Sequence, residues 1–217
     1  MKKFILPILI ILICCGTAFY FMNKSFVLGR IGMSLSSKPL PASKTDKLQD
    51  GVAKNGKKIL IAYFSWGGNT RKTAQYIHSL VGGDIVEIRT VKPYPEGYRA
   101  TVKVGKEELD KQILPEIDSK VDTSKYDMLI IGYPIWYYKE PLAIDTFLKN
   151  ANTKGKVILP FATSGGSTIE ASVPSMQKYA PEAKFGEPLL ANDKDLIEPW
   201  LKRNGALYDV AINNDKV

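Results

Sequence analysis

A short segment rich in glycine and in hydroxyl and amide side chains follows an apolar run near residue 64, and a helical pattern follows it at once. The segment reads Ser65-Trp66-Gly67-Gly68-Asn69-Thr70. Glycines let backbone N–H groups approach an anion, short polar side chains donate hydrogen bonds, and a helix N-terminus adds a favourable dipole. The segment therefore predicts a phosphate cradle. The alternative is a glycine-rich turn that only joins a strand to a helix.

Two later segments complete a candidate binding site. Residues 133–141 contain four aromatic residues where a solvent-facing turn would be polar. Aromatic side chains in such a place cover a flat ligand or pack against a partner. A third segment, which again follows an apolar run, is Thr163-Ser164-Gly165-Gly166-Ser167. Together the three segments predict a site for a phosphorylated, planar, aromatic ligand.

Other chemistries are poorly supported by the sequence. The first segment lacks the Gly-Lys-Ser/Thr ending of a nucleoside-triphosphate loop and the three-glycine spacing of a dinucleotide fingerprint. The single histidine, His78, falls in a helical pattern, where we expect a surface or packing role. The two cysteines, Cys14 and Cys15, lie in the N-terminal segment, which excludes a disulfide, zinc site or catalytic thiol from the rest of the chain.

The elements that must position these segments alternate along the chain. Short continuous apolar runs predict strands at residues 59–64, 85–91, 128–133, 157–162 and, more weakly, 188–191. Between them, helical patterns occupy residues 71–81, 98–113, 141–149, 168–179 and 195–204. This alternation is typical of βαβ units around a parallel sheet that is buried on both faces. Ligands of such sheets bind beyond the carboxyl ends of the strands, where the three segments fall.

Two prolines test this assignment. Pro160 lies within a strand that should be interior, so we expect a locally unpaired edge there. Pro174 lies within an expected helix, so we expect a kink. Ser167 and Glu170 have the spacing of a capping box at the start of that helix, and Pro141 suits the first turn of the preceding one.

The three segments, in this order, resemble the flavodoxin family. The resemblance is carried by residues 62–70, 132–137 and 161–167 and extends over about residues 57–205. It implies a flavodoxin-like α/β fold, a three-layer sandwich around a five-stranded parallel sheet in the order 2-1-3-4-5. It also implies FMN as the cofactor.

The resemblance assigns roles to individual residues. Pro134, Ile135, Trp136 and Tyr137 would line the isoalloxazine ring, and Thr163, Ser164, Gly165 and Gly166 would close the far side. The FMN phosphate would be held by Ser65, Gly67, Gly68, Asn69 and Thr70. Trp66 departs from the small polar residues common in that loop, and it either shields the phosphate or packs on the surface.

The aromatic segment also departs from the family. Tyr137 and Tyr138 stand where electron-transferring flavodoxins often have glycine, and a peptide flip at this turn supports the flavin semiquinone in that family. Because a non-glycine residue resists a positive φ, we expect little semiquinone here. Arg71, Lys72 and Lys139 would favour the anionic reduced flavin.

The sequence leaves the function open between three classes. The first is an electron carrier that serves a protein or membrane partner, and the second is an FMN-dependent NAD(P)H:quinone-type reductase. The third is a non-redox module that binds another phosphorylated aromatic ligand.

The stretch 92–125 is longer than a minimal crossover between two strands. Within it, Tyr94, Pro95, Tyr98 and Arg99 would form either a lid over the flavin or a plain surface elaboration.

The N-terminal part of the chain predicts attachment to a membrane. After Lys2 and Lys3, residues 4–22 are uncharged and nearly long enough to span a bilayer, while residues 23–56 are typical of a polar spacer before a domain at residues 57–217. A cleaved signal peptide and a lipoprotein at Cys14 or Cys15 are the alternatives. We expect the domain to face outward from the cytoplasm.

The net charge argues against a nucleic-acid partner once it is divided. Residues 1–56 carry 8 Lys/Arg and 2 Asp, a net +6, whereas residues 57–217 carry 22 Lys/Arg and 20 Asp/Glu, a net +2. Most of the chain's basicity therefore belongs to the N-terminal segment rather than to the expected domain.

Overall fold

The computed structural model describes residues 51–208. The expected anchor or signal at residues 1–22 lies outside the described residues, as do residues 23–50 of the expected spacer and residues 209–217. Within residues 51–208, none of the helices has both the length and the apolar character needed to cross a bilayer.

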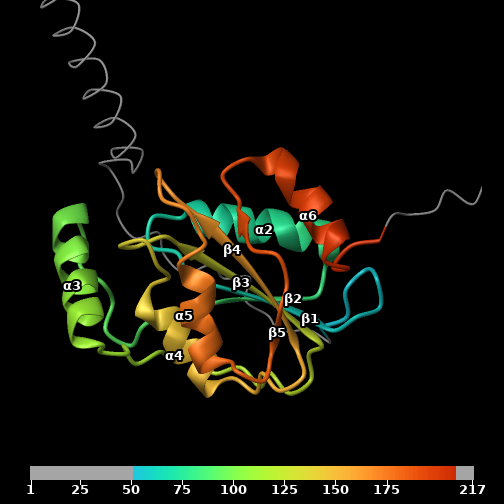
Figure 1. Ribbon diagram of the computed structural model, residues 1–217, viewed down its shortest axis with the longest axis horizontal. Helices are drawn as coiled ribbons and strands as arrows, with labels where there is room; N and C mark the ends of the chain where they lie inside the picture. Colours follow the sequence, from blue (N-terminus) through green and yellow to red (C-terminus); the bar gives the residue numbers. More distant parts are fainter. Residues whose placement is uncertain (1–50, 209–217) are drawn as a thin grey trace, which may run out of the picture.

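The centre of the domain is a parallel sheet, as the alternating pattern predicted (Figure 1). Its strands run in the order β2 (Asp84–Glu87), β1 (Ile59–Tyr63), β3 (Met128–Pro134) and β4 (Val157–Thr163). The outer position beside β4 is shared by β5 (Lys184–Phe185) and β6 (Leu189–Leu190). The expected order 2-1-3-4-5 is therefore confirmed.

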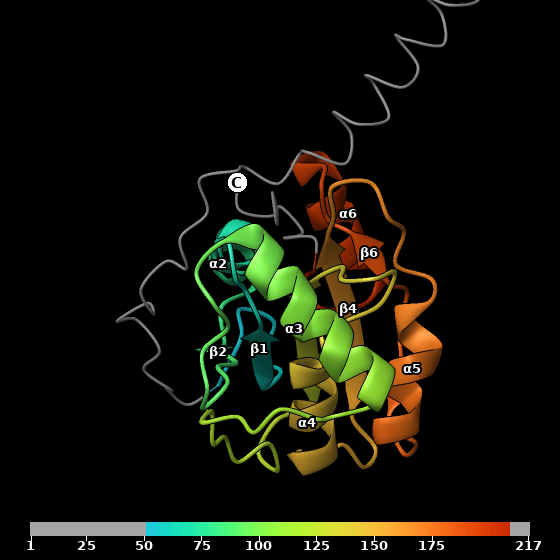
Figure 2. The same cartoon turned by 90° about the vertical axis from the view of Figure 1, so that its left-hand side faces the viewer.

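Helices cover both faces of the sheet and give the three-layer arrangement that was expected. Figure 1 shows α2 (Asn69–Val81) and α6 (Ile197–Arg203) on one face, and α4 (Leu142–Asn150) and α5 (Ser172–Tyr179) on the other. A 3₁₀ turn, η1 (Lys194–Leu196), leads into α6. The remaining helix, α3 (Tyr98–Lys111), stands to one side in Figure 1 and crosses in front of α4 in Figure 2.

The alternation of side chains along the strands builds two hydrophobic cores. In β1, Leu60 and Ala62 pack with the α4 and α5 layer, whereas Ile59, Ile61 and Tyr63 pack with the α2 and α6 layer. A β-carbon at position 132 would lie 2.1 Å from Cζ of Phe161, so only glycine fits there beside β4. Because both faces are buried, β1 is apolar throughout rather than alternating.

Pro160 explains why the outer strand is broken. The β4 carbonyls of Ile158 and Ala162 accept hydrogen bonds from Gly186 and Ala191 in the outer segment. Residue 160 lies two positions from each of these residues, so its backbone nitrogen points toward the same outer segment. Proline has no N–H there to donate a hydrogen bond. The outer strand is interrupted opposite this position, between β5 and β6. The expected unpaired edge is confirmed, and the single strand expected at 188–191 is replaced by two short ones.

The structure corrects the expected start of α5. The helix begins at Ser172 instead of residue 168, and its N-cap is Ala171, so the predicted capping box of Ser167 and Glu170 is wrong. Pro174 consequently lies in the first turn, where the backbone N–H needs no helical partner. No kink is therefore required to accommodate it. The second strand is also shorter than expected, since β2 ends at Glu87.

Residues 51–56, at the end of the expected spacer, pack against the domain. Ala53 is 4% exposed and forms an antiparallel bridge with Gly82. The side-chain amide of Asn55 donates to the carbonyl of Ala206 at 3.0 Å. The packed part of the domain therefore includes these residues.

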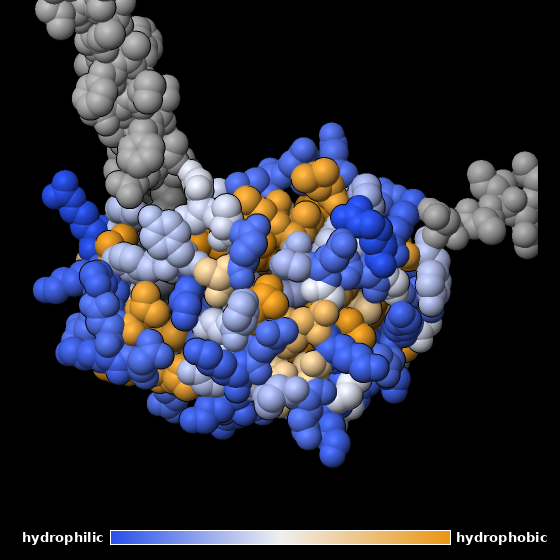
Figure 3. All heavy atoms as spheres, viewed as in Figure 1, coloured by the Kyte–Doolittle hydropathy of each residue, from blue (hydrophilic) through white to orange (hydrophobic). Residues whose placement is uncertain are grey.

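The outer face of α3 is charged and solvated. Its ion pairs, Lys106 with Asp110 and Lys111 with Glu107, have the i,i+4 spacing of an exposed helix surface. Figure 3 shows mostly hydrophilic side chains at this end of the molecule, with hydrophobic side chains in several separate areas elsewhere on the same face. Only Thr101 and Gly105 of α3 are buried, so this helix is held by a narrow strip of contacts.

Candidate functional site

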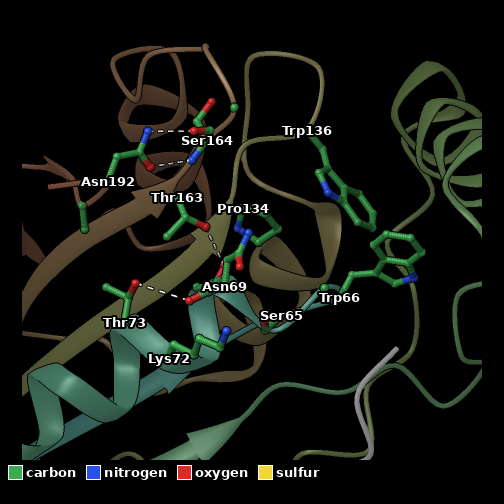
Figure 4. A pocket seen from close by; sticks show the side chains of 14 residues that line it. Ser65, Trp66, Asn69, Lys72, Thr73, Pro134, Trp136, Thr163, Ser164 and Asn192 are labelled. Atoms are coloured by element: carbon green, nitrogen blue, oxygen red, sulfur yellow. Dashed lines mark hydrogen bonds between the residues drawn. The ribbon is translucent and has the colours of Figure 1, made fainter. Parts of the chain in front are cut away.

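A cavity of about 400 Å³ lies beyond the carboxyl ends of β1, β3 and β4, where the fold predicts a ligand site. Figure 4 shows its wall, with the indole rings of Trp66 and Trp136 on one side and Ser164 and Asn192 on the other. All three predicted segments contribute to it. The lining residues are Ser65, Trp66, Gly67, Asn69, Thr70, Lys72, Thr73, Pro134, Trp136, Thr163, Ser164, Gly165, Ala191 and Asn192.

The first segment is folded around the hydroxyl group of Ser65. Its Oγ accepts hydrogen bonds from the backbone N–H groups of Gly68 at 3.1 Å and Arg71 at 3.2 Å. Gly68, the N-cap of α2, has φ 87° and ψ −7°, a left-handed conformation that glycine adopts without a steric penalty. The chain can therefore turn sharply from β1 into α2.

The N-terminus of α2 is suited to an anion. Its N-cap residue, Gly68, has no side chain to cap the helix, and its first turn has no acidic residue. The first N–H groups of a helix have no acceptor within the helix, and the helix dipole favours negative charge beside them. Lys72, a residue that the sequence analysis did not assign to the cradle, adds a cationic side chain to the wall.

A hydrogen bond between hydroxyl groups ties the cradle to the far rim. Oγ1 of Thr70 and Oγ1 of Thr163 are 2.9 Å apart, and Thr70 is 1% exposed. Nearby, the hydroxyl of Thr73 donates to the carbonyl of Asn69 at 3.3 Å. The helix and the end of β4 thus present their polar groups to the same cavity.

The rim is shaped by Asn192, which the sequence analysis missed. Its side-chain oxygen accepts from the N–H of Ser164 at 3.0 Å, and its amide nitrogen donates to the Ser164 carbonyl at 2.7 Å. Oγ of Ser164 in turn accepts from the N–H groups of Gly166 and Ser167. Asn192 follows the weak last strand, and only the parallel pairing of β6 with β4 would have indicated its position.

Trp136 is held in an aromatic cluster at the edge of the cavity. Its ring lies edge-on to Phe64 at 5.5 Å and to Tyr94 at 5.0 Å between centroids. A β-carbon at Gly105 of α3 would lie 3.1 Å from Cε3 of Trp136, so the helix backbone approaches the indole closely. These contacts fix the orientation of the ring.

Trp66 packs on the protein surface, one of the two roles that the sequence left open. Its indole Nε1 donates to the carbonyl of Pro95 at 3.3 Å, so the ring packs on the crossover segment. It also lines the cavity. Among the suggested lid residues, Tyr94 is buried, Tyr98 and Arg99 are exposed, and none of them is among the lining residues.

The turn after Trp136 contradicts one expectation. Trp136 and Lys139 exchange backbone hydrogen bonds at 2.8 and 3.0 Å, and the two residues between them, Tyr137 and Tyr138, have φ 49° and 66°. Positive φ at both central positions defines a type I′ turn, which ordinarily contains asparagine and glycine. The expectation that these tyrosines prevent a positive φ is therefore wrong. The expectation of little flavin semiquinone, which was drawn from it, no longer follows. Each such residue costs on the order of 1–3 kcal/mol.

Four of the predicted residues do not line the cavity. Gly68 and Gly166 act through the backbone of their loops, and Ile135 is 6% exposed in the core of the α4 and α5 layer. The hydroxyl of Tyr137 donates to the carbonyl of Val102 in α3 at 2.8 Å. Its ring is also 5.9 Å from Nζ of Lys106, so Tyr137 faces α3.

Most of the cationic side chains expected near the ligand interact with other protein groups instead. Arg71 forms a buried ion pair with Glu87 at 2.5 Å. The side chain of Lys139 donates to Oγ of Ser175 in α5 at 3.3 Å. Of the three cations that the sequence suggested, Lys72 is the one that lines the cavity. The charge offered to a bound anion therefore comes from Lys72 and the α2 N-terminus.

Comparison with known proteins gives one family match. A family model described as flavodoxin matches residues 58–204. No curated protein matches the chain.

Several solved structures share this fold and part of the sequence. A candidate flavoprotein from Bacteroides eggerthii is 37% identical, with a TM-score of 0.60, and the match covers 68% of this chain and 97% of that one. A second from Bacteroides uniformis is 31% identical, with a TM-score of 0.60, covering 67% and 98%. A flavoprotein from Lactobacillus acidophilus, solved in complex with FMN, is 26% identical, with a TM-score of 0.57, covering 66% and 98%.

Proposed function

Because the chain belongs to the flavodoxin family, we propose that it binds FMN in the cavity beyond β1, β3 and β4 and carries electrons to a redox partner. The observation that carries this proposal is the N-terminus of α2, whose N-cap glycine provides no side-chain cap and whose first turn contains no acidic residue. The N-terminus of a helix is a ready-made binding site for a phosphate group, because its backbone N–H groups point toward the ligand. The likeness to a Lactobacillus acidophilus flavoprotein that was solved with FMN supports the choice of cofactor.

The donor set of the first segment fits a phosphate. The backbone N–H groups of Asn69 and Thr70 would bind its oxygens, because the first residues of a helix lack helical acceptors. Ser65 shapes the loop by accepting from Gly68 and Arg71, and its hydroxyl hydrogen would be directed to a phosphate oxygen. Lys72 would add a cationic contact. Phosphate recognition would therefore depend mainly on backbone geometry.

The remaining wall fits the flat part of the same ligand. Trp66, Pro134 and Trp136 would exclude water from one side of the ring, and the Ser164–Asn192 pair would close the opposite rim. FMN would supply the redox chemistry. The role of the protein residues would be to orient the ring and to limit its contact with solvent.

The partner and the location are parts of the same proposal. We infer that the uncharged segment at residues 4–22 anchors the domain to a membrane, with the domain on the extracytoplasmic side. The polar stretch that follows would let the domain reach a protein partner or a membrane-bound quinone. The sequence of residues 1–50 supports this part of the proposal.

The decisive experiment is a titration of the purified protein with FMN, riboflavin and FAD, followed by absorbance and flavin fluorescence. We expect one FMN per chain and weaker binding of riboflavin, which lacks the phosphate. Stoichiometric FAD without measurable affinity for FMN would overturn the proposal. A second assay with NAD(P)H and a quinone separates the two redox functions, because sustained turnover without a partner protein would indicate a reductase instead of a carrier.

A further inference from the structure

Two buried carboxyl groups lie directly behind the strained turn at the wall of the cavity. Glu140 follows Lys139, the last residue of the turn, and Asp145 lies one turn further on in α4. The two residues are 2% and 1% exposed. The turn, Glu140 and the start of α4 with Asp145 therefore follow one another directly along the chain.

The surroundings of the carboxyl groups are short of hydrogen-bond partners. Within residues 51–208, both oxygens of Glu140 and Oδ1 of Asp145 are buried without a hydrogen-bond partner. The same is true of the Tyr133 hydroxyl on β3 and the Ser172 hydroxyl on α5. Ser175 and Asp145 nonetheless lie near enough to Glu140 to act on its pKa through side-chain hydrogen bonds, and a bond between two carboxyl groups requires a proton on one of them.

The titratable groups facing this pair come from each element packed around it. β3 contributes Tyr133, and the turn contributes Lys139, whose amino group is held by Ser175 of α5. From α5, Lys178 and Tyr179 lie further away, within electrostatic range. Lys139 is therefore the main positive charge available to balance the two carboxyl groups.

A single proton shared by Glu140 and Asp145 removes most of the electrostatic cost of burying two negative charges. Burial, together with the neighbouring Glu140, raises the pKa of Asp145 to about 8. Burial also raises the pKa of Glu140. Two interacting carboxyl groups in a buried site do not both ionise readily. With one proton between them, the remaining negative charge is balanced by Lys139.

We propose that Glu140 and Asp145 are a positioning pair that keeps the Trp136–Lys139 turn closed while they share a proton and releases the turn when that proton is lost. The turn is predisposed to open because Tyr137 and Tyr138 hold left-handed conformations that non-glycine residues avoid. Its closure therefore depends on the packing behind it. The role in ligand binding rests on the proposed FMN site, because Trp136 lines that cavity.

Loss of the proton would act through the junction of α4 and α5. A second negative charge in this site requires hydration, which the packed interface does not supply. Water would enter between the two helices and break the contact between Lys139 and Ser175. The turn would then relax, and Trp136 would lose its fixed position against Gly105 of α3.

The first test needs no flavin. In a Trp66→Phe background, two tryptophans remain, Trp136 and the fully buried Trp200, so a change in acrylamide quenching reports on Trp136. We expect quenching to rise between pH 7 and pH 9 and to stay level in Asp145→Asn, which keeps a neutral hydrogen-bond donor in place. Glu140→Gln is the second variant, and Glu182→Gln, an exposed carboxyl outside the site, is the matched control.

The second test measures the FMN dissociation constant of the full-length protein over the same pH range. We expect binding to weaken by roughly two- to tenfold between pH 7 and pH 9, the effect of losing one aromatic contact, and to remain level in Asp145→Asn. Quenching that is level in the parent, or that rises equally in Asp145→Asn, would overturn the proposal. Absence of FMN binding at pH 7 with the expected quenching profile would overturn the proposed function and leave the proton-dependent turn established.

Discussion

The hydroxyl groups of Thr70 and Thr163 lie 2.9 Å apart, although 93 residues separate them in the sequence. Thr70 belongs to the first turn of α2, and Thr163 is the last residue of β4. Their hydrogen bond joins the two polar walls of the cavity. A change at either residue is therefore expected to affect both the cradle and the rim.

Thr70→Ala is expected to weaken FMN binding more than riboflavin binding. The variant loses the hydroxyl that would bind the charged phosphate, with an expected cost of roughly 1–3 kcal/mol. It also loses the hydrogen bond to Thr163. Fluorescence titration with both ligands measures the difference. Ser79→Ala, which removes an exposed hydroxyl from the last turn of the same helix, should leave both affinities unchanged. Equal weakening of the two ligands would show that Thr70 does not serve the phosphate.

Trp136→Ala is expected to restore part of the fluorescence of bound FMN, whereas Tyr137→Phe is not. The indole of Trp136 lines the cavity, while the hydroxyl of Tyr137 is bonded to α3. Loss of the tryptophan should also cost about 0.5–1.5 kcal/mol in FMN affinity beyond its buried area. Emission spectra of the saturated variants provide the measurement. Recovery of emission in a Tyr137→Ala variant alone would reassign the stacking residue.

Asp145→Asn is expected to stabilise the protein at pH 8. The folded-state pKa of Asp145, about 8, exceeds its unfolded value of 3.8, so the stability contributed by its proton is fully present below about pH 4 and is lost as the pH rises through 8. One unit of pKa shift corresponds to about 1.4 kcal/mol, so we expect the variant to gain at least about 2 kcal/mol at pH 8. Urea unfolding from pH 4 to pH 9 measures this. A difference from the parent that does not depend on pH would contradict the assignment.

Tyr138→Gly is expected to raise the free energy of unfolding by about 0.5–1 kcal/mol. Tyr138 is 65% exposed with φ 66°, so glycine relieves backbone strain while little packing is lost, and the greater entropy of the unfolded chain offsets part of the gain. Thermal unfolding provides the measurement. Val91→Gly is the control, because Val91 is also exposed but has no positive φ, and it should destabilise the protein. If Tyr138→Gly destabilised the protein as much, strain at this turn would be excluded.

The sequence predicted the elements whose signals are local and strong. The buried strands of the parallel sheet are continuous apolar runs, and Ser65 to Thr70 combine the residue types that a cradle between a strand and a helix requires. Both features depend on neighbouring residues, so their places in the fold could be inferred from the order of segments alone.

The features that the sequence did not predict depend on contacts between distant segments. Asn192 reaches the site only because β6 pairs with β4, and Lys139 is drawn away from it by Ser175 of α5. The left-handed turn at Tyr137 contradicts local propensity, because tertiary packing outweighs the preference of a single residue. The partnership of Glu140 with Asp145 likewise follows from burial, which spacing along the chain does not reveal.

The interruption of the outer strand at Pro160 also bears on how copies of this domain behave when they are crowded. Exposed strand edges act as templates that recruit strands from other molecules, and short or broken edges reduce this tendency. Here β5 and β6 are two residues each, and the opposite margin, β2, has only four. Neither border of the sheet offers a long ladder of unpaired amides and carbonyls. The proline that breaks the regular pairing of β4 therefore also makes the domain resistant to edge-to-edge aggregation.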